Sequence, residues 1–214
     1  MNWLILQGDA HHMPIADNSI DAVVTDPPYL IGFMGRDFDK QSDAHKNPKK
    51  MQQWHYEWAI EALRVLKPGG HLLAFGGTRT SHRLTCALED AGFEIRDCLM
   101  WCYASGFPKS LDVSKQLDKM AGREREHGTP GPFTSRRPRE KTVRINAYHN
   151  GVGDAASALL TTPVTDAAKQ WEGWGTSLKP SYEPVVLCRK PLSEPTVAQN
   201  VLRWGTGALN IDKC

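Results

Sequence analysis

The chain has 214 residues, of which 40% are hydrophobic and 23% are charged, which is enough apolar material for the core of one domain, with or without an insertion. A formal net charge of +2 is too small to indicate a nucleic-acid partner by itself, and no apolar run approaches the length of a membrane span. The five cysteines form neither a C-x-x-C pair nor an even disulfide framework, so neither a zinc site nor a disulfide-rich fold is expected.

The first predicted element is a short strand at the apolar run Trp3-Leu4-Ile5-Leu6. Gly8 and Asp9 follow it, and a carboxylate just past a strand end is a common place for a nucleotide-like cofactor to be held. Asp9 is therefore a candidate cofactor ligand, although an ordinary Gly-Asp turn explains the same residues equally well. The N-terminal residues contain no basic leader or cleavage site, and we expect a soluble, cytoplasmic protein.

The next apolar run, Ala22-Val23-Val24, predicts a buried strand that ends at Asp26-Pro27-Pro28-Tyr29. Two prolines remove two backbone donors and fix φ twice, so the strand should end in a rigid rim. Asp26 and a neighbouring carbonyl can accept both hydrogens of an amino group, and Tyr29 offers a flat face on which a base can stack. A proline-rich turn without a chemical role is the alternative interpretation.

Asp26-Pro27-Pro28-Tyr29 resembles the catalytic motif of the DNA methyltransferases that modify amino groups. The resemblance implies methyl transfer from S-adenosylmethionine to adenine N6 or cytosine N4, with all four motif residues catalytic and Asp26 also facing the cofactor. Asp rather than Ser at the first position favours adenine in that family, and the family also carries a Gly-Asp at the place of Gly8 and Asp9. It further implies an α/β fold, a Rossmann-like sheet with helices on both faces, and an irregular recognition insertion.

Residues 30–47 are expected to form a loop, either a lid that closes over a base or a surface loop. A helix is predicted over Pro48–Leu66, because apolar residues recur at helical spacing, and Lys67-Pro68-Gly69-Gly70 should end it. His71–Phe75 is the next predicted strand. Thr78 or Thr80 should cap a helix that runs to about Ala91.

Two further strands are predicted at Phe93–Ile95 and Cys98–Tyr103, with Cys98 and Cys102 in or near the core. An aromatic run then leads from Trp101 to Pro108. In the resembled family a Trp followed by a proline-containing loop helps to wall the target-base pocket, which implies a pocket formed by three residues: Tyr29, Trp101 and Pro108. Packing of these aromatic residues against the sheet is the competing interpretation.

Residues 109–179 differ in composition and carry the excess of positive charge. Residues 1–107 have ten basic and thirteen acidic side chains (−3), residues 108–150 have ten and five (+5), and residues 151–214 have six of each. A basic cluster lies within this segment: Arg136, Arg137, Arg139, Lys141 and Arg144. We interpret it first as phosphate contacts and second as base readout, and the segment as a DNA target-recognition insertion.

Residues 180–214 are expected to return to the sheet through a strand at Val185–Cys188. Their Lys-Pro, Glu-Pro-Val-Val-Leu and Lys-Pro pattern resembles phage and prophage adenine methyltransferases in which the catalytic motif precedes the cofactor loop. The same resemblance implies that Gly207 and Asn210 belong to the start of the cofactor-binding half. Because the family's Phe-x-Gly-x-Gly loop does not follow, we expect a truncated chain with a catalytic half at 1–108, an insertion at 109–179 and a partial cofactor half at 180–214.

The sequence therefore predicts a site-specific DNA methyltransferase of the restriction-modification kind that uses S-adenosylmethionine, acts on duplex DNA and needs no metal. Three alternatives stay open: a catalytically silent DNA-binding remnant, cytosine N4 as the target, and a methyltransferase acting on RNA or protein. The recognition sequence and the oligomeric state are not predicted.

Overall fold

The computed structural model describes residues 3–32, 37–40, 43–103, 110–125, 127–130, 159–178 and 182–213. The chain divides into two compact units. The first consists of Met1–Ser105 with Ser181–Cys214 and carries the Asp-Pro-Pro-Tyr motif, and the second is Gly106–Pro180.

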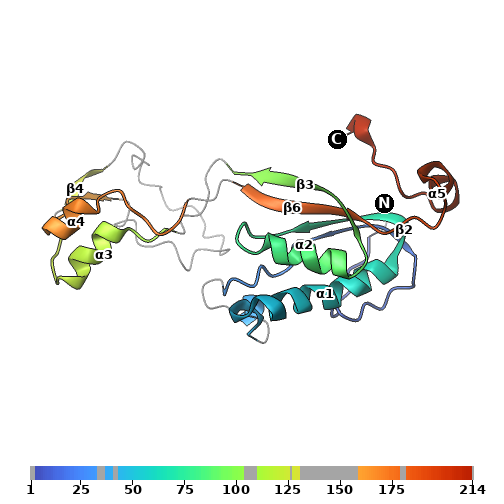
Figure 1. Ribbon diagram of the computed structural model, residues 1–214, viewed down its shortest axis with the longest axis horizontal. Coiled ribbons are helices and arrows are strands. Elements are labelled where there is room, and N and C mark those ends of the chain that lie inside the picture. Colours follow the sequence, from blue (N-terminus) through green and yellow to red (C-terminus); the bar gives the residue numbers. More distant parts are fainter. Residues whose placement is uncertain are drawn as a thin grey trace. The chain divides into compact units, whose positions relative to one another are not determined.

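A four-stranded mixed sheet organises the first unit (Figure 1). Its strand order is β1 (Ile20–Thr25), β2 (Leu66–Phe75), β6 (Tyr182–Arg189) and β3 (Glu94–Cys102). β1 runs parallel to β2, whereas β6 runs antiparallel to both β2 and β3. The carboxyl ends of β1, β2 and β3 therefore meet the amino end of β6 at one edge of the sheet. The α/β class predicted from the sequence is confirmed.

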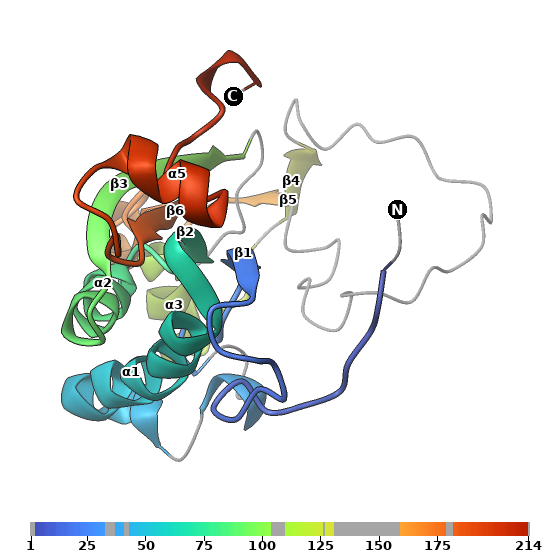
Figure 2. The same ribbon diagram turned by 90° about the vertical axis from the view of Figure 1, so that its right-hand side faces the viewer.

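Two helices, α1 (Pro48–Val65) and α2 (Ser81–Asp90), lie side by side along the sheet (Figures 1 and 2). α1 begins where predicted because Asn47 accepts hydrogen bonds from the Lys49 and Lys50 amides. The main core joins the inward faces of these helices to alternate residues of β2 and β6. Its buried members are Trp58, Ala59, Ala62, Leu66, Leu72, Ala74, Leu84, Leu88, Phe93, Val186 and Cys188.

The strand predicted at residues 3–6 is not part of the sheet. Its side chains are exposed, from 56% at Leu6 to 82% at Trp3, and an isolated apolar run without a partner strand cannot pair its backbone groups. The two strands predicted near residues 93–103 form one strand, β3, with a register shift between Ile95 and Asp97. Cys98 and Cys102 are exposed, so the prediction that they are core thiols is wrong.

Helix α1 ends at Val65, and Lys67-Pro68-Gly69-Gly70, the residues predicted to end it, already belong to β2. It is held by the segment that contains α5 (Val197–Trp204), which packs where β2 begins (Figure 1). The buried amide of Asn200 donates to the carbonyls of Pro68 and Thr206, both at 2.9 Å. Gly69 has φ +80°, and a Cβ there would lie 2.6 Å from Asn200 Nδ2, so only glycine fits this turn.

The second unit contains α3 (Val113–Met120), β4 (His127–Pro130), β5 (Leu159–Thr161) and α4 (Asp166–Gln170). Asp118 is its buried centre, since its carboxylate pairs with Arg125 Nε at 2.6 Å and accepts the amides of Val164 and Thr165. Near the two ends of the described part of this unit, the Leu111 amide donates to Thr176 Oγ1 at 2.9 Å, which joins the two ends.

Within the described ranges no helix combines the length and the apolar character that crossing a membrane requires.

Candidate functional site

The Asp-Pro-Pro-Tyr motif directly follows β1, at the edge where β1 and β2 end. Pro27 is buried whereas Asp26 as a whole residue is exposed, so the strand end is anchored while Asp26 stays accessible. Leu30, just after the motif, is fully buried with φ +55°, a left-handed conformation that a Leu adopts only when its surroundings hold it. That support is Asp39, a buried carboxylate that accepts the Leu30 amide at 2.7 Å and the Ile31 amide at 3.1 Å.

Tyr29 is held by the turn between β2 and α2. Of the two expected caps, Thr78 and Thr80, it is Thr80 that occupies the N-cap position of α2. Its side chain makes no capping hydrogen bond, and its hydroxyl instead donates to the Tyr29 carbonyl at 3.0 Å. A Cβ on Gly77 would lie only 3.1 Å from Tyr29 Cδ2, so the absence of a side chain there makes room for the tyrosine ring. The turn after β2 thus fixes Tyr29, the aromatic residue that follows the neighbouring strand β1.

Glu183 at the amino end of β6 completes a cluster of two carboxylates and two phenols. The negative charges of Asp26 and Glu183 act on the Tyr29 phenol, and the charge of Glu183 also acts on the Tyr103 phenol. Pro184 places Glu183 there, since its carbonyl accepts the Gly76 amide at 2.9 Å. Neither Glu183 nor Tyr103 is among the site residues predicted from the sequence. A Glu-Pro at the start of a predicted strand was the available signal, but its pairing partner was not predictable from it.

The pKa values of this cluster shift because carboxylates and phenols share a partly desolvated edge. Burial raises the pKa of Asp26, the hydrogen bond from Tyr29 opposes that shift, and the charge of Glu183 adds to it. Burial, followed by the charges of Asp26 and Glu183, raises the pKa of Tyr29 well above its ordinary value. The pKa of Tyr103 rises to about 12, first by burial and then through Glu183. Both phenols therefore stay protonated at neutral pH.

Trp101 lies in β3, directly opposite Glu183 in the strand pairing. Its ring contacts Phe75 edge-to-face at a centroid distance of 6.1 Å, yet the side chain is 58% exposed. The residue is thus at the motif's edge of the sheet, and packing against Phe75 leaves much of its surface open. Pro108, the third residue predicted for the base pocket, lies outside the described residues.

The predicted cofactor residues are not brought together. Asp9 Oδ1 accepts the His11 amide at 3.0 Å within a local turn, and this hydrogen bond lowers the pKa of Asp9. Gly207 approaches Gly69, whereas Asp26 is beside the end of β2; Gly69 and Phe75 are six residues apart, about 20 Å along a strand. Asn210 is exposed on the same C-terminal segment as Gly207. Cofactor contacts by Gly207 and Asn210 remain predictions without a geometric link to Asp26.

The predicted basic cluster (Arg136, Arg137, Arg139, Lys141 and Arg144) lies outside the described residues, as do parts of the predicted 30–47 loop. The described parts of that loop include two short 3-10 helices, Asp37–Asp39 and Ala44–Lys46. Leu30 and Ala44 pack with Met51 of α1 in a small second core, so these parts are anchored against the helix. Closure of the loop over a base stays a prediction.

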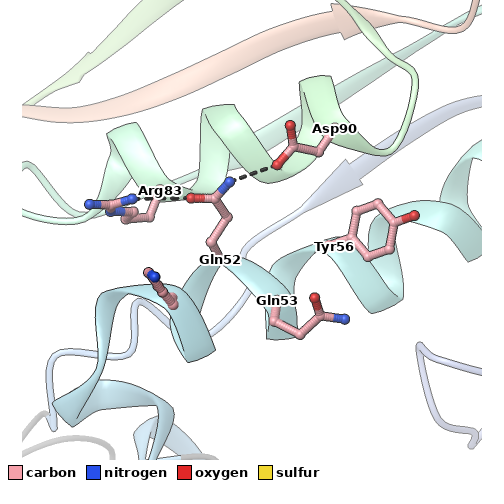
Figure 3. A pocket seen from close by; sticks show the side chains of 6 residues that line it. Gln52, Gln53, Tyr56, Arg83 and Asp90 are labelled. Atoms are coloured by element: carbon pink, nitrogen blue, oxygen red, sulfur yellow. Dashed lines mark hydrogen bonds between the residues drawn. The ribbon is translucent and has the colours of Figure 1, made fainter.

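A polar pocket of about 400 Å³ opens between α1 and α2 (Figure 3). Gln52 crosses it, accepting from Arg83 Nη1 at 3.2 Å and donating to Asp90 Oδ2 at 2.6 Å. Its lining mixes both charges with amides: Lys49, Gln52, Gln53, Tyr56, Arg83 and Asp90. These bonds join the two helices, and none of the lining residues belongs to the cluster around Asp26.

Comparison with known proteins adds family information to this geometry. A family model described as DNA methylase matches residues 20–194. The type II methyltransferase M.HindIII of Haemophilus influenzae is 25% identical over 225 residues, covering 90% of this chain and 59% of the relative. M.HpaI of Haemophilus parainfluenzae, also a type II methyltransferase, is 33% identical over 105 residues, or 49% of this chain and 32% of the relative.

Among solved structures, a Thermus thermophilus protein complexed with S-adenosyl-L-methionine has a TM-score of 0.41 and 16% identity, covering 90% of this chain and 56% of that one. A SAM-dependent methyltransferase from Methanosarcina mazei has a TM-score of 0.36 and 14% identity, covering 87% and 66%. The chain spans less than two thirds of the length of M.HindIII, M.HpaI and the Thermus protein.

Proposed function

Because the chain belongs to the DNA methylase family, whose model matches residues 20–194, we propose that it transfers a methyl group from S-adenosylmethionine to adenine N6 in duplex DNA. The observation that carries the proposal is the exposed carboxylate of Asp26 at a rigid strand end, beside the ring of Tyr29. An Asp rather than a Ser before Pro-Pro-Tyr supports adenine over cytosine N4.

The proposed chemistry must make the lone pair of an exocyclic amine available for attack. Its lone pair is delocalised into the ring, so the nitrogen is a poor nucleophile. Asp26 and the Pro27 carbonyl can accept its two hydrogens, which favours a tetrahedral nitrogen and frees the lone pair. Positioning and charge complementarity supply most of the effect, so Asp26 need not be a strong base. The base must leave the duplex first, at a cost of a few kcal/mol that stacking on Tyr29 partly offsets.

S-adenosylmethionine, when bound, supplies the electrophilic methyl group. The described residues offer the amine-accepting side of such a reaction, but the glycine pair beside the motif leaves no room for the methionine part of the donor. The glycine pair that follows β2 is filled, because a Cβ on Gly76 would meet Leu84 and Ser81 at 3.3 Å, and Gly77 faces Tyr29. The role proposed for the residues around Asp26 is therefore to hold the amine and the base.

Replacing Asp26 tests the proposal. Asp26→Ala should lower transfer of tritiated methyl groups to unmethylated genomic DNA by about a thousandfold or more, because the main acceptor of the amine is removed, while DNA binding stays nearly intact. Asp21→Ala is the matched control, since Asp21 is exposed at the other end of β1 and pairs with Lys67. Equal transfer by wild type and Asp26→Ala would refute the role of Asp26, and nucleoside analysis of the product separates N6-methyladenine from N4-methylcytosine.

The filled glycine pair favours one competing function, a chain that binds DNA without catalysing transfer. Titration calorimetry with S-adenosylmethionine separates the two. Micromolar binding of the donor by the 214-residue chain supports the enzyme, whereas DNA binding without donor binding supports the silent alternative.

A further inference from the structure

We propose that Trp171 and Trp174 form an aromatic stacking site on the second unit, and that this site takes unpaired bases of DNA that has been opened for methylation. The inference rests on the proposed function for its DNA partner, and it adds a contact far along the chain from the Asp-Pro-Pro-Tyr motif. It concerns binding and assigns no step of methyl transfer to these two residues.

The two tryptophans lie on the surface of the second unit. Trp171 is 40% exposed and Trp174 is 60% exposed. Their rings contact each other in a T-shaped pair, with the centroids 5.0 Å apart and the planes at 75°. Because tryptophan is mostly buried in folded proteins, an exposed pair indicates a contact surface and not core packing. Much of Trp174 stays uncovered in this pair, so it can accept a further flat ring.

The backbone holds these rings on a braced turn between α4 and α3. The Trp171 amide donates to the Ala167 carbonyl of α4 at 3.2 Å, and the Trp174 amide donates to the Trp171 carbonyl at 3.2 Å. The Trp174 carbonyl accepts the amide of Val113, the first residue of α3, at 3.0 Å. Gly173, between the two tryptophans, has φ +79°, a left-handed conformation that favours glycine. Binding a base therefore requires little further ordering of this segment.

The helices that flank the turn are themselves joined. α3 and α4 pack against each other (Figure 1), and the buried Ser114 hydroxyl donates to the Ala168 carbonyl at 2.7 Å. Directly after the turn, Gly175 pairs with Asp112 in an antiparallel bridge, and a Cβ on Gly175 would collide with Ser110 Oγ. The turn is therefore fixed to the packed part of the unit on both sides.

Charge favours bases over phosphates as the target of this turn. The described residues of the second unit carry five basic and five acidic side chains, so they have no net positive charge. Glu172, between the two tryptophans, is exposed and would repel a phosphate. The attraction to a polyanion comes instead from residues 108–150, which carry ten basic and five acidic side chains. Base faces are uncharged and stack on aromatic rings with little regard to sequence.

The base faces become available only when the duplex is opened. In an intact duplex each base is stacked between its neighbours, whereas extruding one base for methylation leaves its former partner and the adjacent bases partly unstacked. Stacking on Trp174 would offset part of the cost of that opening. We therefore expect the site to contribute more to the binding of opened DNA than to the binding of fully paired DNA.

Fluorescence anisotropy without S-adenosylmethionine tests the inference on the full 214-residue chain. The probes are a labelled duplex with a central bubble of unpaired bases and its fully paired counterpart. Trp174→Ala should raise Kd for the bubble about tenfold, and Kd for the paired duplex by less than about threefold, because a stacking surface is lost. The slope of log K against log salt should stay unchanged, since no phosphate contact is removed.

Two further substitutions separate stacking from general apolar contact. Trp174→Phe keeps a flat ring and should stay within about threefold of wild type on the bubble, whereas Trp174→Leu should bind as weakly as Trp174→Ala. Met120→Ala is the matched control, because Met120 is 74% exposed at the other end of α3 and should contribute to neither probe. Far-ultraviolet circular dichroism checks that each variant is folded.

Equal binding of the bubble by wild type and Trp174→Ala overturns the inference and leaves the proposed function standing. Wild-type affinity in Trp174→Leu also overturns it, and assigns the pair to a general apolar contact such as another protein. An altered salt slope in Trp174→Ala argues against stacking in the same way. A wild-type chain that binds neither probe refutes the DNA substrate of the proposed function, and the inference falls with it.

Discussion

At the scale of single residues, the motif depends on a side chain outside it. Asp26-Pro27-Pro28-Tyr29 is rigid because of its prolines, but the chain must then turn inward at Leu30 with φ +55°. Asp39 makes that turn possible because its carboxylate accepts the Leu30 and Ile31 amides as they leave the solvent. The motif is therefore fixed on one side by Thr80 and on the other by Asp39.

We predict that Asp39→Ala lowers the free energy of unfolding by about 2 to 4 kcal/mol, because it leaves buried amides unsatisfied. Urea unfolding followed by circular dichroism measures the change. Asp37→Ala is the matched control, since Asp37 lies on the same short helix with a fully exposed side chain, and it should cost less than about 0.5 kcal/mol. Equal decreases in the two variants would show that the carboxylate of Asp39 does not support the turn.

At the scale of elements, α1 buries a histidine that makes its packing depend on pH. His55 is 2% exposed, and its Nδ1 accepts the Trp58 indole N–H at 3.2 Å, which requires a neutral ring nitrogen. Burial lowers the pKa of His55 from 6.5 to about 4. Below pH 6.5, His55 binds a proton in the unfolded chain but stays neutral in the folded chain. The contribution of the buried neutral ring to the free energy of unfolding is therefore full above pH 6.5 and declines as the pH falls toward 4.

We predict that the wild type loses about 2 kcal/mol more unfolding free energy between about pH 7 and about pH 5 than His55→Gln does. Glutamine does not titrate, and its amide oxygen can still accept from Trp58. Urea unfolding at the two pH values gives the comparison. Parallel decreases in the two proteins would show that His55 is protonated, or solvated, in the folded state.

At the scale of the whole molecule, what the sequence predicted well was local. The helix at 48–65 and the strand at 20–25 follow from periodicity, capping and an apolar run, all within a few residues of each other. The burial predicted for that strand is wrong, because Ala22 and Val24 are exposed. The strand at residues 3–6 and the buried positions of Cys98 and Cys102 failed for a common reason. Apolar runs show that a segment can pair or pack, but the sheet decides which segments find a partner and which face is covered.

The same limit explains why Glu183 had no predicted role. Its place beside Asp26 depends on β6 entering antiparallel between β2 and β3 after an intervening unit, a pairing between residues roughly a hundred positions apart. Gly207 shows the converse. The family resemblance implied a place in the cofactor-binding half, which stays a prediction, and the structure shows the Gly207 backbone close to Gly69.

The remaining question at this scale is how the second unit contributes, and its excess charge gives a quantitative test. Residues 108–150 carry ten basic and five acidic side chains, and we propose that the basic cluster contacts DNA phosphates. Removing one phosphate interaction reduces the magnitude of the negative slope of log K against log salt by about 0.9. We predict that the double variant Arg136→Ala/Arg137→Ala weakens duplex binding uniformly across sequences and reduces the magnitude of the slope by up to about 2.

The control removes the same charge from the same unit at residues that already have acidic partners. Lys115 pairs with Asp112 at 3.9 Å and Lys169 pairs with Asp166 at 3.0 Å, so Lys115→Ala/Lys169→Ala should leave the slope nearly unchanged. Fluorescence anisotropy with a labelled duplex, from low to physiological salt, measures both. An equal change of slope in the two double variants would mean that net charge alone attracts DNA. Weaker binding to one sequence only would instead assign Arg136 and Arg137 to base readout.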